Sequence, residues 1–102
     1  MKKYKPKIYN VDIDGTLTYG TSWTAEECLK AKPRLDVIAA INELYRYNAI
    51  TIYTARREDL FEATMIWLRK YNVHYHNTNF GTKPPGVQID LDAINKITDI
   101  KH

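Results

Sequence analysis

The sequence predicts an α/β protein built around a small parallel sheet. Short β-branched segments alternate with amphipathic helical segments along the chain, which is typical of βαβ units. The 102 residues suffice for one domain, so residues 1–102 are expected to form a single unit. The 44% hydrophobic content is enough for a modest core. Polar side chains follow several of the predicted strands, which places a candidate site at the carboxyl edge of the sheet.

The first predicted strand covers residues 8–13. Ile8, Val11 and Ile13 are β-branched, and Tyr9 also favours extended structure. Gly15 predicts a turn directly after it, because glycine adopts backbone angles that other residues avoid.

Residues 17–32 show no clear periodicity and are predicted to be a loop. Thr24 and the residues after it are able to open a short helical turn. Trp23 is either a lid or substrate platform, or a side chain packed onto the domain edge. Cys28 is expected to be a packed small residue, because nothing nearby in the sequence activates it.

The middle of the chain predicts two helices separated by a strand. Pro33 suits the first turn of a helix over residues 34–47, which Asn48 would end in a left-handed conformation. A strand is predicted over residues 50–54, and a second amphipathic helix over 59–71, ended by Asn72. The inward stripes of the two helices are predicted to be Val37, Ile38, Ile41, Leu44 and Tyr45, then Leu60, Thr64, Trp67, Leu68 and Tyr71.

The last third of the chain carries weaker signals. Residues 73–75 are predicted to be a third strand, and residues 77–86 a loop because they hold asparagine, glycine and two prolines. Residues 87–89 predict a fourth strand, with a short helix from about residue 92.

Asp12 and Asp14 stand where the first strand ends. Residues two apart on a strand face the same way, so these carboxylates need a hard cation or a shared proton between them. A calcium-binding helix-loop-helix is not favoured, because the preceding segment reads as a strand. Thr54 and Asp90 also follow predicted strands, and Lys83 precedes the last one, so all five side chains are expected at one edge.

The run Asp-Ile-Asp-Gly-Thr-Leu-Thr at residues 12–18 resembles the first motif of the haloacid dehalogenase-like (HAD) phosphohydrolases. The whole layout is similar to small, capless members that occur in polysaccharide biosynthesis and in phages. The resemblance implies a three-layer α/β/α Rossmann-like sandwich without a cap domain, in which the first strand is central, between the second and the fourth.

The resemblance also implies an activity, Mg²⁺-dependent hydrolysis of phosphomonoesters through an aspartyl-phosphate. Asp12 would be the nucleophile and Asp14 the acid and base, with Thr54 hydrogen-bonding the phosphoryl group and Lys83 neutralising its charge. Gly15, Thr16 and Arg56 are predicted substrate contacts. For Arg56 and Arg57 the alternative is a helix-start side chain paired with Glu58 or Asp59.

The predicted metal ligands are Asp12 and Asp14 with Asp90 or Asp92. The usual fourth motif ends in two adjacent aspartates, whereas here Leu91 separates Asp90 from Asp92. Asp92 is either a displaced ligand or the N-cap of the last helix. A weakened metal site would leave the alternative function, a slow or inactive relative that binds phosphate or nucleic acid.

Charge and cysteine content indicate the expected compartment and partners of the protein. The net charge of +3 is concentrated in Lys2, Lys3, Lys5 and Lys7, which form either a patch for phosphate or nucleic acid or a solvated terminus. One cysteine allows no internal disulfide, and no signal peptide or membrane span is recognised, so a cytoplasmic protein is expected. The partner expected is a phosphorylated small molecule or nucleic-acid end, and no membrane. The open site implies either a large substrate, or a second copy of the chain that covers it, or poor selectivity, and sequence does not choose among these.

Overall fold

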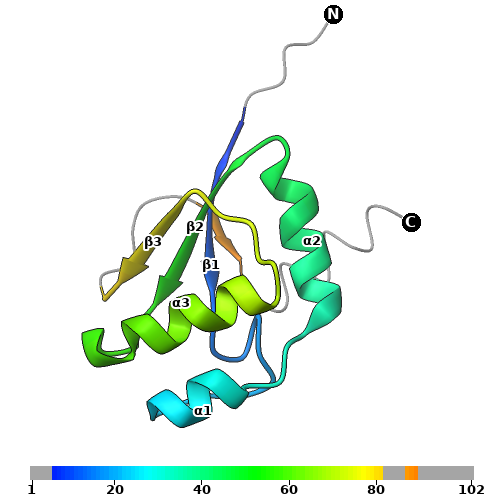
Figure 1. The fold of residues 1–102 in the computed structure, drawn as a ribbon. Coiled ribbons are helices and arrows are strands. Elements are labelled where there is room, and N and C mark those ends of the chain that lie inside the picture. Colours follow the sequence, from blue (N-terminus) through cyan, green and yellow to red (C-terminus); the bar gives the residue numbers. More distant parts are fainter. Residues whose placement is uncertain (1–5, 82–86, 90–102) are drawn as a thin grey trace, which may run out of the picture.

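A parallel sheet with the strand order β3-β2-β1-β4 forms the centre of the computed structural model, which describes residues 6–81 and 87–89 (Figure 1). The strands are β1 (Ile8–Asp12), β2 (Ala49–Thr54), β3 (Asn77–Phe80) and β4 (Val87–Ile89). β1 lies between β2 and β4, as the resemblance implied. All pairings are parallel, so the carboxyl ends of the strands meet at one edge.

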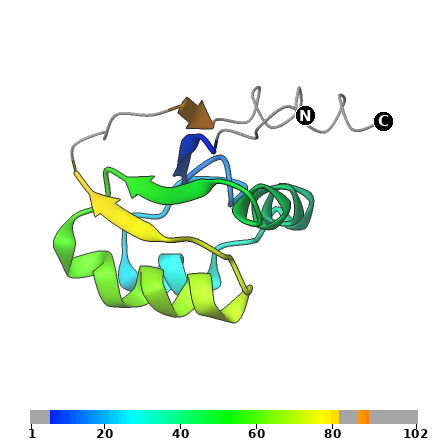
Figure 2. The ribbon, with the colours of Figure 1, turned by 90° about the horizontal axis from the view of Figure 1, so that it is seen from above.

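The connections between the strands carry the helices, namely α1 (Ala25–Lys30), α2 (Leu35–Tyr45) and α3 (Phe61–Lys70). A 3₁₀ turn, η1 (Glu58–Leu60), leads into α3. Figure 2 shows α1 and α3 on the same side of the sheet. The predicted Rossmann-like α/β class is confirmed. The helix predicted from about residue 92 falls outside the described residues.

One apolar core joins the sheet to α2 and α3. The helices contribute the apolar stripes predicted for them. Residues at three- and four-residue spacing share one face of a helix, and alternate residues share one face of a strand, so the apolar faces of both pack together. Trp67 is 1% exposed, and its Nε1 donates a hydrogen bond to the carbonyl oxygen of Ala31 at 2.9 Å, so the largest core side chain has a polar partner as well. The buried members of this core are Val11, Ile13, Leu17, Val37, Ile38, Ala40, Ile41, Ile50, Ile52, Trp67, Leu68 and Val73.

The predicted helical turn after Trp23 is confirmed as α1. Thr24 and Glu27 form a capping box, in which the Thr24 Oγ1 accepts from the Glu27 N–H at 3.1 Å and the Glu27 Oε1 accepts from the Thr24 N–H at 3.1 Å. Cys28 is fully buried between α1 and the start of α3, as its packing interpretation predicted.

Two predicted helix boundaries are wrong. Pro33 does not open α2, because it pairs with Thr18 in an isolated antiparallel bridge and α2 begins at Leu35. Asn48 is not left-handed; its side-chain amide instead donates to the Leu44 carbonyl oxygen at 3.0 Å and closes the end of α2. Asn72, with a φ of 55°, does end α3 in the predicted left-handed conformation.

The third strand is also misplaced in the prediction. Residues 73–75 connect α3 to the sheet, and the strand is β3, at positions assigned to a loop. Val73 is buried because it packs under the core, not because it belongs to a strand. β3 ends the strand order, and its Asn-Thr-Asn-Phe sequence is only partly buried, so it lacks the apolar signature of a central strand.

No helix in the described part of the chain is long and apolar enough to cross a membrane.

Candidate active site

A tight turn after β1 brings Asp12 and Asp14 to the same cavity. The carbonyl oxygen of Ile13 accepts from the N–H groups of Thr16, Leu17 and Thr18 at 3.1, 2.9 and 3.2 Å. Gly15 has a φ of 81°, the left-handed conformation that the turn requires. The chain therefore reverses within a few residues of the strand end, and both aspartates line a cavity of about 380 Å³.

Asp14 is held by Arg56 in a bidentate ion pair. Arg56 Nη2 lies 2.7 Å from Asp14 Oδ1, and Arg56 Nε lies 3.1 Å from Asp14 Oδ2. The N–H of Ser22 donates to Asp14 Oδ1 as well, at 3.2 Å. Three donors thus converge on one carboxylate and fix its position, since a guanidinium fork matches carboxylate geometry.

Arg56 is itself buried and is held by a hydrogen bond to Thr64. Its side chain is 3% exposed, against 18% for Asp14. The Arg56 Nη1 donates to Thr64 Oγ1 at 2.9 Å, and that hydroxyl donates to the Leu60 carbonyl oxygen at 2.7 Å. The loop after β2 and the first turns of α3 therefore set the position of Asp14, whose own strand is β1.

The prediction for Arg56 missed this partner. Glu58 and Asp59, the alternative partners weighed for Arg56, do not pair with it; Asp59 pairs with Arg57, at 3.2 Å. Thr64 was predicted only as an inward-facing helical residue. Thr64 is a polar residue in an otherwise apolar stripe, eight residues after an arginine. That position is the sequence signal that its hydroxyl forms a hydrogen bond with a buried polar group.

Asp12, Trp23 and Arg57 complete the cavity around Asp14. The Asp12 Oδ1 accepts from the N–H of Ile13 at 2.8 Å, which fixes the rotamer of the predicted nucleophile. Trp23 is 72% exposed and lines the cavity, so it is not packed onto the domain edge, and its role as a lid or substrate platform stays a prediction. Arg57 adds an exposed cation to the rim.

The structure places Thr54 behind this cavity. It is fully buried at the end of β2, and its Oγ1 accepts from the Arg56 N–H at 3.1 Å. Thr16 is also buried, and Gly15 lies in the turn, where its N–H donates to the Gly20 carbonyl oxygen at 3.2 Å. These three predicted site residues support the two aspartates in this structure.

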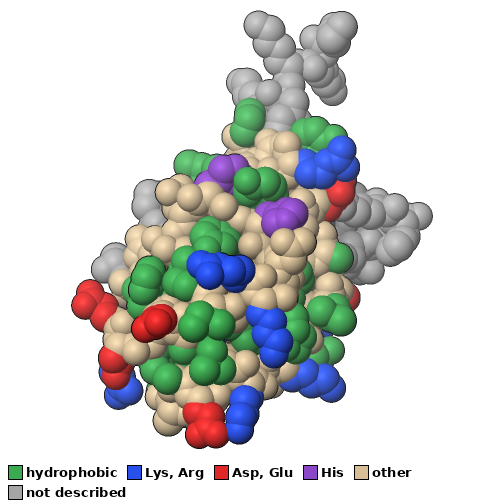
Figure 3. All heavy atoms as spheres, viewed as in Figure 1, with side chains coloured by type: hydrophobic (Ala, Val, Ile, Leu, Met, Phe, Trp, Pro, Cys, Tyr) green, Lys and Arg blue, Asp and Glu red, His purple; other side chains and the backbone are tan. Residues whose placement is uncertain are grey.

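The other predicted site residues, Lys83, Asp90 and Asp92, lie outside the described residues. Across residues 6–81 and 87–89, no three histidine, cysteine or acidic side chains form a metal-binding cluster. The predicted basic patch at Lys2, Lys3 and Lys5 falls outside as well, and Lys7 is exposed. On the face drawn in Figure 3, basic side chains of the described residues lie apart from one another, and several lie beside acidic ones.

Comparison with known proteins shows similarity at the level of fold. No model of a protein family matches the chain, and no curated protein does. A chain of the Pnkp1/Rnl/Hen1 RNA repair complex matches with 20% identity and a TM-score of 0.64, over 93% of this chain and 30% of that one. A second structure of the Pnkp1/Rnl/Hen1 complex matches with 19% identity and a TM-score of 0.63, over 83% and 28%. This chain thus spans less than a third of either chain that it resembles.

Proposed function

We propose that this protein is a phosphomonoester hydrolase of the HAD-like type, with Asp12 as its nucleophile. The observation that carries the proposal is the pair of carboxylates at the end of a central parallel strand, Asp12 in the cavity wall and Asp14 clamped beside it by Arg56. A carboxylate is a competent nucleophile toward a phosphoryl group. Two carboxylates in different surroundings are suited to different roles in one reaction.

The proposed reaction has two steps. Asp12 forms an oxygen–phosphorus bond while the ester oxygen–phosphorus bond breaks, and Asp14 supplies the proton that the leaving oxygen takes. Asp14 then removes a proton from water as the water oxygen attacks phosphorus, which releases phosphate and restores Asp12. Arg56 and the Ser22 N–H keep Asp14 in place through both steps.

Mg²⁺ suits the donor set of this cavity. A carboxylate has about four acceptor positions, and Asp14 already uses three of them on Arg56 and Ser22. Asp12 is therefore the described side chain placed to hold the ion, with Asp90 or Asp92 as the further expected ligand. Mg²⁺ usually needs only one or two protein carboxylates besides substrate and water. When bound, it would act as a Lewis acid on the phosphoryl oxygens.

Two substrate classes fit this cavity, a phosphorylated small molecule and a phosphorylated nucleic-acid end. Residues 17–32 form a loop and the short helix α1. Trp23 lines the cavity and is 72% exposed, so its ring is accessible to a large substrate. The fold similarity to chains of RNA repair complexes supports the nucleic-acid class.

Hydrolysis of a generic aryl phosphate tests the proposal. Wild-type protein should release phosphate with Mg²⁺ and lose that activity in a chelator, and Asp12→Asn should remove it in both conditions. Asp36→Asn, an exposed aspartate on α2 that lines neither this cavity nor its rim, is the matched control and should keep full activity.

Two outcomes would contradict the proposal. Asp12→Asn with undiminished release would exclude Asp12 as the nucleophile. Tight phosphate binding by wild type, with no release at any Mg²⁺ concentration, would favour the non-catalytic binding module that Leu91 suggests.

A further inference from the structure

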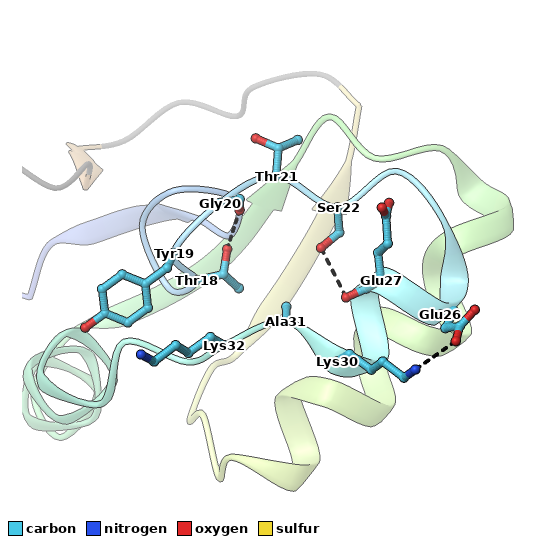
Figure 4. Close-up of a pocket in the computed structure, with 10 residues that line it drawn as sticks. All are labelled: Thr18, Tyr19, Gly20, Thr21, Ser22, Glu26, Glu27, Lys30, Ala31 and Lys32. Atoms are coloured by element: carbon cyan, nitrogen blue, oxygen red, sulfur yellow. Dashed lines mark hydrogen bonds and ion pairs between the residues drawn. The ribbon is translucent and has the colours of Figure 1, made fainter.

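A second depression adjoins the active-site cavity. It has a volume of about 450 Å³ and lies between the loop after β1 and the segment after α1. Thr21 and Ser22 line both this depression and the cavity that holds Asp12, so this short stretch of chain is a common wall of the two hollows. Figure 4 shows Tyr19 and Lys32 at one end of the depression, and Glu26 with Lys30 at the other.

The chain between the two hollows is tied to the catalytic turn. The N–H of Ser22 donates to Asp14, and its Oγ donates to the Glu27 carbonyl oxygen at 3.3 Å (Figure 4). The Gly20 carbonyl oxygen accepts from the Gly15 N–H at 3.2 Å and from the Thr18 Oγ1 at 2.7 Å. The depression therefore has a fixed position relative to Asp12 and Asp14.

Tyr19 has a partly exposed ring with two cations over it. It is 56% exposed. The Lys32 Nζ lies 5.1 Å from the ring centroid and the Arg34 Cζ 4.7 Å from it. The Tyr19 N–H donates to the Lys32 carbonyl oxygen at 3.2 Å, so the backbone holds the ring and this lysine together. A ring ordered before binding loses little entropy when a ligand stacks on it.

The acidic side chains of the depression are already engaged. Glu26 pairs with Lys30 at 2.8 Å. Glu27 Oε1 accepts from the N–H groups of Trp23 and Thr24 at 2.8 and 3.1 Å. Arg34 and Arg57 are paired as well, with Asp36 at 3.9 Å and with Asp59 at 3.2 Å, so Lys32 is the cation at Tyr19 for which the described residues show no ion pair.

From this arrangement we infer that the depression binds the single-stranded nucleic acid that continues from the terminal phosphate in the active site. This binding mode rests on the proposed function, because it assumes that the terminal phosphate lies in the active site. A base stacks on Tyr19, Lys32 meets a backbone phosphate, and Trp23 contacts the nucleotide next to the reacting phosphate. Aromatic platforms with adjacent cations are how proteins hold single strands without reading their sequence. A neutral glycan would stack on the rings but would make no use of the cations.

Binding of oligonucleotides with a terminal phosphate tests the inference. Affinity is measured by Trp fluorescence in chelator on Asp12→Asn protein, which removes turnover, for a mononucleotide and a hexanucleotide. The hexanucleotide should bind more tightly. Tyr19→Ala should weaken it roughly 5- to 150-fold, the range for one lost base–aromatic stack, and leave the mononucleotide unchanged. Tyr19→Phe should keep the affinity, which separates stacking from any folding defect.

Salt dependence tests the role of Lys32. For wild type, the logarithm of affinity should fall linearly with the logarithm of salt concentration, and Lys32→Ala should reduce that slope by about 0.7 for one lost single-strand phosphate contact. The control is Tyr47→Ala. Tyr47 is 55% exposed and has the Arg46 Cζ at 5.3 Å from its ring, but it lines neither hollow. This variant should bind the hexanucleotide as wild type does.

The outcomes separate this inference from the proposed function. Equal affinity for both lengths, or a hexanucleotide affinity indifferent to Tyr19→Ala, would overturn the subsite even if aryl phosphate is hydrolysed. Tyr19-dependent binding of the hexanucleotide by a protein without phosphatase activity would keep the subsite and reject the hydrolase. Tyr19-dependent binding of a phosphorylated oligosaccharide in place of the oligonucleotide would overturn the nucleic-acid assignment.

Discussion

Arg56 is the residue on which the geometry of the site depends. Its guanidinium is nearly fully buried and divides its donors between Asp14 and Thr64. A buried ion pair is costly to break, about 3–5 kcal/mol when one partner is removed, because the remaining charge is left without compensation. Arg56 therefore links the folding of the loop after β2 to the position of Asp14, the proposed catalytic acid and base, on the turn after β1.

Thr64→Val should slow catalysis by misaligning Arg56 and, through it, Asp14. The change keeps the side-chain shape and removes one hydrogen bond to a charged group, which is typically worth about 1.5–3 kcal/mol, or roughly a tenfold to hundredfold change. We expect kcat for an aryl phosphate to fall by about tenfold, with little change in KM.

Thr64→Ser is the control for this positioning role. It keeps the hydroxyl that accepts from Arg56, so it should restore most of kcat, although it deletes a buried methyl group. If Thr64→Val and Thr64→Ser have the same kcat and differ only in thermal stability, Thr64 is a structural residue alone.

The partner of Arg56 could not be predicted from local sequence. Pairs close in sequence, such as Arg57 with Asp59, follow from spacing, whereas Asp14 lies 42 residues from Arg56. Both residues follow parallel strands and were predicted to lie near the same sheet edge. Which side chain meets which depends on the paths of the two loops, and these are set by tertiary packing.

At the scale of elements, Asn72 shows how α3 ends. Its φ of 55° is left-handed, and the following Val73 N–H donates to the Leu68 carbonyl oxygen at 3.0 Å. Asn72→Ala should lower the free energy of unfolding by about 1 kcal/mol, because a β-carbon without a compensating polar group is disfavoured there. Asn72→Gly should be neutral or stabilising.

Chemical denaturation of the two variants checks this prediction. Both keep the backbone carbonyl of residue 72, which accepts from Asn42 Nδ2 at 3.0 Å, so the comparison isolates the backbone conformation. Equal midpoints for Asn72→Ala and Asn72→Gly would show that the left-handed conformation carries no strain.

The elements with a strong apolar or β-branched pattern were predicted from the sequence. The element that depends on pairing with a distant strand was missed. α2 and α3 carry apolar stripes, and β1 and β2 carry β-branched residues, so each was located within a few positions. β3 is a polar strand at the end of the described sheet. Its identity depends on pairing with β2, from Thr51 with Asn77 to Thr54 with Phe80, which no local pattern encodes.

At the scale of the whole molecule, Cys28 packs the segment between β1 and β2 against the rest of the fold. It packs with Leu60 and Ala63, so α1 is sealed onto η1 and α3. Burial raises the pKa of the Cys28 thiol above its ordinary value of 9.0, and the nearby Arg56 guanidinium opposes that shift only in part.

Stability should therefore depend on alkaline pH through Cys28. The contribution of the neutral thiol is fully present below pH 9.0. Above it, the unfolded chain loses this proton while the folded chain keeps it, so the free energy of unfolding falls by up to about 1.4 kcal/mol per pH unit until the pH passes the folded pKa. Denaturation curves between pH 8 and pH 10.5 measure that fall, and in Cys28→Ala it should be shallower. Parallel curves for the two proteins would assign the alkaline loss to other groups.

The α/β class follows from the order of elements in the sequence, whereas the central position of β1 was implied by the family resemblance. The composition of the site follows only in part. Asp12 and Asp14 do line one cavity. Thr54 is fully buried at the end of β2 and its Oγ1 accepts from the Arg56 N–H, so its contact with a phosphoryl group stays a prediction. A hydroxyl at a strand end serves either the ligand or the backbone, and sequence does not separate those roles.

The most direct test of the central claim is to trap the phosphoryl group on Asp12. Protein mixed with aryl phosphate and Mg²⁺ is quenched in acid within one turnover, digested, and analysed by mass spectrometry. The peptide that contains Asp12 should gain one phosphoryl group in wild-type protein and none in Asp12→Asn. Efficient hydrolysis with no phosphoryl group on that peptide, at quench times shorter than a turnover, would contradict the aspartyl-phosphate mechanism.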